Sequence, residues 1–173
     1  DPTDGLAIAK LVSTYKATIM FGTSTFYRLY VKNQKIHPLM FESPRVTVSG
    51  AEKLREEVRI DFKKRFGKDI LEGFGTTETS PVATCNLPDV IAPDYTVQVG
   101  QKTGTVGMAI PGTTIKIVDS QSFEELEANE EGMILISGIQ VMKGYLNDEE
   151  KTSKVLKIIN SKTYYISGDK GKI

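Results

Sequence analysis

A strand, a helix and a second strand follow one another within about 30 residues, and this order limits the fold more than any other feature of the sequence. β-Branched residues predict a strand over residues 45–49, and residues 69–74 predict the next strand. Between them, apolar side chains recur on one helical face, and Gly67 ends that helix. That face consists of Leu54, Val58, Phe62 and Phe66. Units of this kind have parallel strands and a right-handed crossover, so we expect an α/β fold.

The exits of three predicted strands share a composition that suits a ligand site. Residues 18–21 predict one more buried strand, with a helix before it over residues 4–15 and another after it to about residue 31. The chain leaves the three strands through segments rich in glycine, hydroxyl and small side chains. Those segments are residues 22–25, 49–52 and 73–80. Because ligands bind beyond the carboxyl ends of parallel strands, we expect the site at this edge of the sheet.

The second half of the chain has a different pattern, with short β-rich stretches separated by turns. Residues 114–118, 133–136 and 164–166 predict strands, and the acidic residues 119–131 predict a solvated hairpin turn. A short helix is expected from Asn147 or Asp148 to about Leu156. The boundary falls near residues 86–97. We therefore predict an α/β portion over residues 1–90 and a small antiparallel β-barrel-like portion over residues 91–173.

The charge balance and the few metal-binding side chains argue against several classes of function. Lys+Arg and Asp+Glu number 22 each, so the chain as a whole has no net attraction for nucleic acid or an anionic membrane. One cysteine and one histidine, Cys85 and His37, give no basis for a disulfide framework or a zinc site. No apolar run reaches the roughly 18 residues that cross a bilayer. Because the chain starts at Asp1 without methionine, we expect it to be a piece of a longer protein.

Residues 73–78, Gly-Phe-Gly-Thr-Thr-Glu, hold the side chains that a nucleotide site needs. Glycine lets a ligand approach the backbone, hydroxyls and amides bind phosphate oxygens, and a carboxylate binds a divalent cation. On the residues alone, a simple turn is an equally good interpretation. The segment is not a Rossmann fingerprint, because Glu78 stands at the third glycine position, and it is not a Walker loop. Asp169 likewise suits either ribose hydroxyls or a hairpin turn.

Five motifs, in order along the chain, resemble those of the adenylate-forming superfamily, which includes acyl-CoA synthetases, luciferases and adenylation domains. The motifs are VSGAE at residues 48–52, GFGTTETSP at 73–81, GTVG at 104–107, GIQVMKGYL at 138–146 and YISGD at 165–169. The resemblance covers nearly the whole chain. FGTSTF at residues 21–26 and GAEKL at 50–54 are most similar to bacterial acyl-ACP synthetases fused to 2-acylglycerophosphoethanolamine acyltransferases. The sequence is therefore expected to be the middle of such an enzyme.

The resemblance implies a two-step ligase that uses ATP and Mg²⁺. A fatty acid attacks the α-phosphate of ATP to give an acyl-adenylate and pyrophosphate, and a phosphopantetheine thiol of acyl carrier protein or coenzyme A then takes the acyl group. The parent would be a cytoplasmic acid–thiol ligase (AMP-forming), with membrane association through other parts of the protein, at the inner membrane. This chain alone is expected to be inactive, because the family's phosphate loop and lysine-bearing domain lie outside it. The alternative is a non-catalytic nucleotide- or acyl-carrier-binding module on the same scaffold.

The resemblance also implies a role for each matching residue. Phe74 corresponds to the aromatic residue that stacks on adenine, although tyrosine is commoner there, and Asp169 corresponds to the aspartate that binds ribose. Thr77, near the phosphate, and Glu78, the magnesium ligand, would carry the catalysis. The other implied ATP- and AMP-binding residues form the adenine-edge loop and the pocket walls: Gly50, Ala51, Glu52, Gly73, Gly75 and Thr76. Because the attacking and leaving oxygens are both anionic, this reaction needs a cation and aligned donors more than a base.

Overall fold

The structure, a computed structural model, describes residues 1–173, and their contacts divide the chain into two compact units. Unit 1 comprises Asp1–Phe74 and Cys85–Met108, and unit 2 comprises Gly75–Thr84 and Ala109–Ile173. Each unit is therefore built from two separate stretches of the chain. The division predicted at residue 90 stays a prediction, and the two units are described one at a time below.

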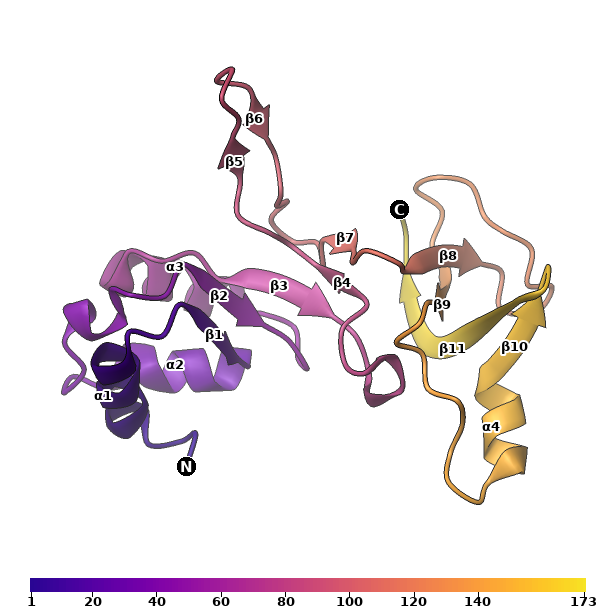
Figure 1. The fold of residues 1–173 in the computed structure, drawn as a ribbon, viewed down its shortest axis with the longest axis horizontal. Helices are drawn as coiled ribbons and strands as arrows, with labels where there is room; N and C mark the ends of the chain where they lie inside the picture. The colour runs from indigo at the N-terminus through magenta and orange to yellow at the C-terminus, as the bar shows by residue number, and fades with distance from the viewer. The chain divides into compact units, whose positions relative to one another are not determined.

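Three parallel strands form the centre of unit 1 (Figure 1). β1 (Ile19–Gly22) pairs with β2 (Val46–Ser49), and β2 pairs with β3 (Leu71–Phe74), both in parallel. The register sets Gly22 beside Ser49, the last residues of β1 and β2, so these two strands end together. The predicted parallel strand–helix–strand unit and the α/β class are thus confirmed.

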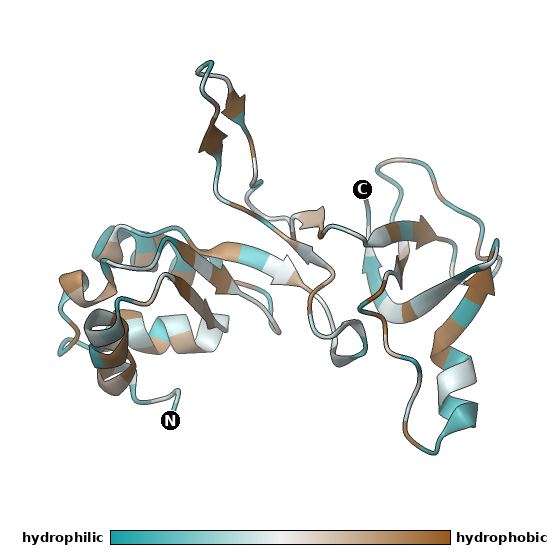
Figure 2. Ribbon diagram, viewed as in Figure 1, coloured by the Kyte–Doolittle hydropathy of each residue, from teal (hydrophilic) through white to brown (hydrophobic).

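β4 (Thr84–Cys85) and β7 (Met108–Ala109) lie where the chain passes between the units, and they complete a sheet of order β1-β2-β3-β4-β7. Within unit 1, the Asn86 amide following β4 donates to the Glu72 carbonyl of β3 at 2.9 Å. The stretch between β4 and β7 forms a hairpin of β5 (Val90–Ile91) and β6 (Val97–Gln98). Its strands are apolar in Figure 2, and their side chains are exposed.

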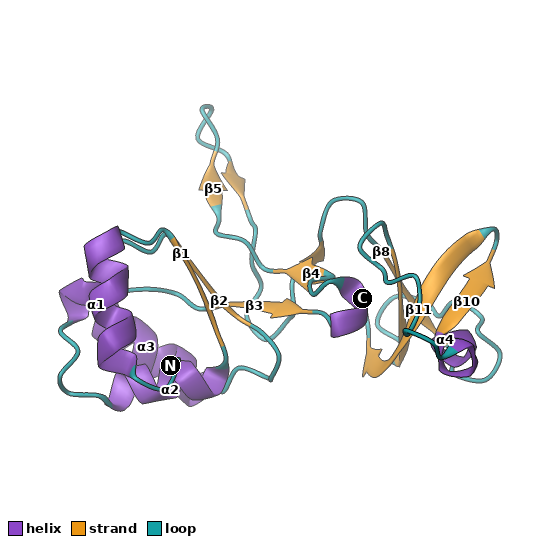
Figure 3. Ribbon diagram, turned by 60° about the horizontal axis from the view of Figure 1, so that its bottom comes forward, coloured by secondary structure: helices purple, strands orange, loops and turns teal.

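Three helices and a short 3₁₀ segment gather on one side of the parallel strands (Figure 3). They are α1 (Gly5–Tyr15), α2 (Ser24–Lys32), η1 (Pro38–Phe41) and α3 (Glu56–Phe66). Local chemistry sets their limits: the Asp4 carboxylate accepts a hydrogen bond from the Ala7 amide at the start of α1, and Gly67 ends α3 in the left-handed conformation. The predicted end of the third helix at Gly67 is confirmed.

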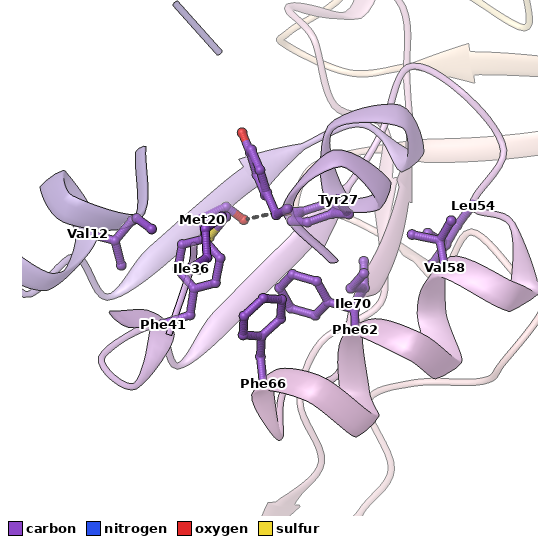
Figure 4. Close-up of a cluster of buried hydrophobic side chains, with 12 residues drawn as sticks. Val12, Met20, Tyr27, Ile36, Phe41, Leu54, Val58, Phe62, Phe66 and Ile70 are labelled. Carbon is purple, nitrogen blue, oxygen red and sulfur yellow. Dashed lines mark hydrogen bonds between the residues drawn. The ribbon is translucent and has the colours of Figure 1, made fainter. Parts of the chain in front are cut away.

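The helices and strands of unit 1 share one aromatic-rich core (Figure 4). Val58, Phe62 and Phe66 of the predicted apolar face are buried there on α3, and Leu54 is buried too but lies two residues before the helix begins, so it is not on the helical face. Tyr27 of α2 meets Phe62 edge-on at 5.1 Å between ring centroids, and its hydroxyl donates to the Val48 carbonyl of β2 at 2.8 Å. The Tyr27 hydroxyl therefore supports β2 two residues before the chain turns at Gly50.

Unit 2 is built around an antiparallel sheet of order β10-β11-β9-β8. Its strands are β8 (Thr114–Val118), β9 (Gly132–Ser137), β10 (Leu156–Ile159) and β11 (Lys162–Gly171). The acidic segment between β8 and β9 is a hairpin connection, as predicted, and the Asp119 carboxylate accepts from the Gln121 and Ser122 amides within it. The second half is thus antiparallel, as predicted. The sheet does not close into a barrel.

Two short helices complete unit 2. η2 (Thr77–Thr79) lies in the turn that follows Gly75, and α4 (Glu149–Val155) precedes β10. The Asp148 carboxylate caps α4 by accepting from the Lys151 amide at 2.9 Å, which agrees with the predicted helix start. Across the whole chain, no helix combines the length and the apolar character needed to cross a bilayer.

Candidate functional site

The residues singled out from the sequence fall in both units. Unit 1 holds residues 50–52 after β2, together with Gly73 and Phe74 at the end of β3. Unit 2 holds residues 75–78 and Asp169. The roles assigned to these residues by resemblance stay predictions, and the structure shows how each group is held within its own unit.

Two strand exits of unit 1 are joined by backbone and side-chain hydrogen bonds. The Gly50 amide donates to the Gly22 carbonyl at 3.1 Å, and the Arg55 amide donates to the buried Ser24 hydroxyl at 3.1 Å. The Thr25 amide donates to Oε1 of Glu52 at 2.7 Å. The exits after β1 and β2 therefore lie together, as the parallel topology predicts.

Glu52 serves the first turn of α2 in this arrangement. The first amides of a helix have no partner within the helix, and a carboxylate at that end satisfies one of them and favours the helix dipole. The hydrogen bond from the Thr25 amide lowers the pKa of the exposed Glu52 carboxyl, so it is ionised at neutral pH. The resemblance places Glu52 in the adenine-edge loop, and no local pattern in the sequence predicts this bond.

The exits after β2 and β3 also lie close together. A Cβ on Gly50 would lie 3.8 Å from the Gly73 carbonyl oxygen, which is ordinary contact distance. Ala51, the next residue, has a φ of 65°, a left-handed conformation that is uncommon for a residue with a Cβ. Phe74 ends β3 and is half-buried. Unit 1 thus brings Gly50, Ala51 and Gly73 to one edge of its sheet.

The turn after Gly75 in unit 2 is tightly packed. A Cβ on Gly75 would collide with the Pro81 carbonyl oxygen and would come within 2.8 Å of Val82 Cα, so only glycine fits there. The fully buried Thr79 hydroxyl accepts from the Thr76 amide at 2.9 Å and lies 3.0 Å from the Thr76 carbonyl oxygen, to which it can donate. These contacts fix the backbone that carries Thr77 and Glu78.

Glu78 contacts two residues of the 138–146 motif. The Tyr145 hydroxyl donates to Oε1 of Glu78 at 2.6 Å, and the Met142 amide donates to the Glu78 backbone carbonyl at 2.8 Å. The Tyr145 hydroxyl is the main reason why the pKa of the Glu78 carboxyl is lowered, and the same bond raises the pKa of Tyr145 to about 12. Glu78 is therefore a carboxylate at neutral pH. Tyr145 belongs to the 138–146 motif, but no pattern in the sequence predicts its contact with Glu78.

A buried hydroxyl lies in the same turn. Oγ1 of Thr76 is shielded from solvent and meets no partner in full hydrogen-bonding geometry, but it interacts with the Glu78 carboxylate and the Tyr165 hydroxyl. The Thr76 and Tyr165 hydroxyls both help to lower the pKa of Glu78. Hydroxyls beside an ionised carboxylate form a polar surface that suits a charged ligand.

The donor set suits a magnesium ion that arrives with a nucleotide. No cluster of three or more His, Cys, Asp or Glu side chains is present to hold a metal ion by itself. Magnesium commonly binds through one or two carboxylates together with phosphate oxygens and water. A single ionised carboxylate, Glu78, with hydroxyls nearby meets that requirement once phosphates are bound.

Asp169 lies on an irregular part of β11. The pairing of β11 with β9 shifts register between Ile166 and Lys170, and Gly168 has a φ of 76°. The Ser167 hydroxyl donates to the Ile134 carbonyl at 2.8 Å and accepts from the Asp169 amide at 3.0 Å. Bulges of this kind redirect side chains. The Asp169 side chain is exposed.

The fold and the ordered motifs define an adenylate-forming protein. The family model described as AMP-binding enzyme matches residues 1–146, so the chain belongs to the AMP-binding enzyme family of the adenylate-forming superfamily.

Relatives with known activities agree with that assignment. The long-chain-fatty-acid–CoA ligase of Salmonella typhimurium is 29% identical over 157 residues, which is 91% of this chain and 26% of that protein. The 4-coumarate–CoA ligase of Pinus taeda is 32% identical over 148 residues, 85% of this chain and 27% of that protein. The chain thus spans about a quarter of the length of these relatives.

A solved structure shows the same fold. The apo and ATP-bound crystal structures of MatB from Rhodopseudomonas palustris superpose on this chain with TM-scores of 0.80 and 0.77. Both are 29% identical to it and cover 98% of this chain and 31% of their own.

Proposed function

We propose that this chain supplies nucleotide-binding residues of an AMP-forming acid–thiol ligase that activates a fatty acid. The observation that carries the proposal is the Glu78 turn, where the Tyr145 hydroxyl holds an ionised carboxylate beside the buried Thr76 hydroxyl. Family membership gives the general chemistry, in which ATP and a carboxylate form an acyl-adenylate. The relatives that are fatty acid–CoA ligases favour a fatty acid as the acid substrate.

Each predicted residue has a defined task in this proposal. Phe74 stacks on adenine, with Gly50, Ala51 and Gly73 lining its edge, and Asp169 binds the ribose hydroxyls. Thr76 and Thr77 contact phosphate, and Glu78 holds magnesium, which neutralises charge as pyrophosphate leaves. Glu52 keeps the adenine-edge loop against α2, and Gly75 lets the backbone turn toward the phosphates.

The acyl acceptor is the finer part of the proposal. Coenzyme A is favoured by the ligase relatives. The similarity of the motifs GAEKL and FGTSTF to those of bacterial acyl-ACP synthetases favours acyl carrier protein. Both acceptors present the same phosphopantetheine thiol. If acyl carrier protein is the acceptor, we propose that the parent protein is cytoplasmic, carries an acyltransferase domain and associates with the inner membrane.

A test is to purify the full gene product that carries these residues and to measure ATP–pyrophosphate exchange with fatty acids of different chain length. We expect exchange that depends on both the fatty acid and magnesium. A second assay compares acyl transfer to coenzyme A with transfer to holo acyl carrier protein. ATP binding without exchange for any acid would favour the non-catalytic nucleotide-binding module instead.

A further test measures the activity of the 173-residue chain alone. We propose that alone it forms no acyl-adenylate, since it spans about a quarter of the length of ligases with the complete reaction. Pyrophosphate release by the chain alone, with ATP, magnesium and a fatty acid, would contradict this part of the proposal.

A further inference from the structure

The segment around Tyr145 contacts Glu78 although the two residues are 67 positions apart in the sequence. A hydroxyl that donates to a carboxylate at 2.6 Å makes a charge-assisted hydrogen bond, which is stronger than one between neutral groups. A carboxylate can accept on both of its oxygens, so a single bond to Oε1 leaves acceptor capacity for a cation. The bond also limits the rotation of the Glu78 side chain.

Tyr145 is in turn fixed by the start of α4. Its backbone amide donates to the Thr152 hydroxyl at 2.8 Å, and that hydroxyl donates to the Asp148 carbonyl at 2.8 Å. The Lys151 ammonium group lies over the Tyr145 ring, 4.4 Å from its centre. The tyrosine is therefore held at its backbone, at its ring and at its hydroxyl.

Gly144 makes this arrangement possible. Its φ is 156°, and a Cβ at this position would lie 2.9 Å from the Thr152 side chain. Any larger residue would push the Tyr145 backbone away from Thr152. The Gly-Tyr pair in the 138–146 motif thus has a physical reason: glycine permits the approach to α4, and tyrosine reaches Glu78.

We propose that Tyr145 is a positioning residue that orients the Glu78 carboxylate for the magnesium ion of bound ATP, and that Thr152 holds Tyr145 in place. The inference rests on the proposed function, since it takes Glu78 as the magnesium ligand. An unrestrained glutamate would have to lose side-chain entropy when the metal binds, whereas a glutamate already held by Tyr145 has lost much of it beforehand.

The test compares the binding of MgATP with that of metal-free ATP, by calorimetry on the full gene product with magnesium or with a chelator. We expect Tyr145→Phe to weaken MgATP binding by about tenfold, the size of a lost hydrogen bond to a charged group, and to leave metal-free ATP unchanged. Thr152→Val should act in the same direction with a smaller effect, and Thr152→Ser should restore binding. Tyr15→Phe is the matched control, because it removes a hydroxyl from an exposed tyrosine of α1.

The outcomes separate this inference from the proposed function. Equal weakening of MgATP and metal-free ATP by Tyr145→Phe, or no weakening of either, overturns the positioning role. If Glu78→Ala abolishes the preference for MgATP while Tyr145→Phe retains it, Glu78 is the metal ligand and only the positioning role fails. A wild-type protein without a preference for MgATP, or a Glu78→Ala variant that keeps it, overturns both. Thermal unfolding of each variant confirms that it is folded.

Discussion

The loop after β2 and the turn after β3 each contain a glutamate, and the two glutamates are held in different ways. Glu52 accepts a hydrogen bond from the Thr25 backbone amide and so closes the first turn of α2. Glu78 accepts from a side chain, the Tyr145 hydroxyl. A carboxylate that satisfies a helix end stabilises the fold, whereas one held by a side-chain hydroxyl keeps acceptor capacity for a ligand. The comparison indicates a structural task for Glu52 and makes Glu78 the candidate for a chemical one.

The largest expected effect on stability comes from replacing the glycine that begins each of these two segments, Gly75 in the turn after β3 and Gly50 in the loop after β2. Gly75→Ala places a Cβ against the Pro81 backbone, which cannot move without moving the turn, so we expect a loss of about 3 kcal/mol or more in the free energy of unfolding. Gly50→Ala has only an ordinary contact at 3.8 Å and no positive φ, so about 0.5 kcal/mol is expected. Urea unfolding followed by circular dichroism measures both. Equal losses would show that the two segments are equally constrained.

The next effect tests how the turn after β3 keeps its shape. Thr79→Val removes the buried hydroxyl that accepts from the Thr76 amide, and leaving that amide unsatisfied should cost about 1–3 kcal/mol. Thr79→Ser keeps the hydroxyl and should recover most of the loss. Hydrogen exchange at the amides of residues 75–80 is the measurement. If valine is tolerated as well as serine, the turn is held by its backbone alone.

The smallest effect is a pH dependence of stability that comes from Glu52 in the loop after β2. The Thr25 amide lowers the pKa of Glu52 in the folded state, so its stabilisation is present above the ordinary value of 4.5 and is lost as the pH falls through the folded pKa. Wild type should therefore melt above Glu52→Gln at about pH 7, and the difference should shrink toward about pH 3. Glu42→Gln, which removes an exposed carboxylate without a hydrogen bond, is the control. A constant difference at all pH values would argue against the bond to the Thr25 amide.

Local patterns predicted the architecture well, because they depend on residues close in sequence. The apolar face from Val58 to Phe66, the stop at Gly67 and the parallel exits all follow from periodicity and turn chemistry. The open shape of the second sheet did not follow, since closure depends on how its edge strands meet rather than on alternation along each one.

The partners of the two glutamates depend on tertiary structure and could not be read from local patterns. Glu52 and Thr25 are 27 residues apart, and Glu78 and Tyr145 are 67 apart. Motif resemblance placed both glutamates near the nucleotide, Glu52 in the adenine-edge loop and Glu78 as the magnesium ligand, but it did not predict what holds either side chain. Only the hydrogen bonds separate a carboxylate that caps a helix from one held by a tyrosine.

The central claim is that Glu78, through the magnesium ion, acts mainly on the rate of adenylation while Asp169 acts mainly on ATP binding, and steady-state pyrophosphate release by the full gene product tests it most directly. Glu78→Ala removes a preorganised electrostatic contact and should lower kcat by about 10²–10³. Asp169→Ala removes contacts to ribose hydroxyls whose charge does not change, so it should raise the KM for ATP more than it lowers kcat. Circular dichroism confirms that both variants are folded. A Glu78→Ala enzyme with near-normal kcat at saturating magnesium would contradict the account and leave residues 73–78 as a structural turn.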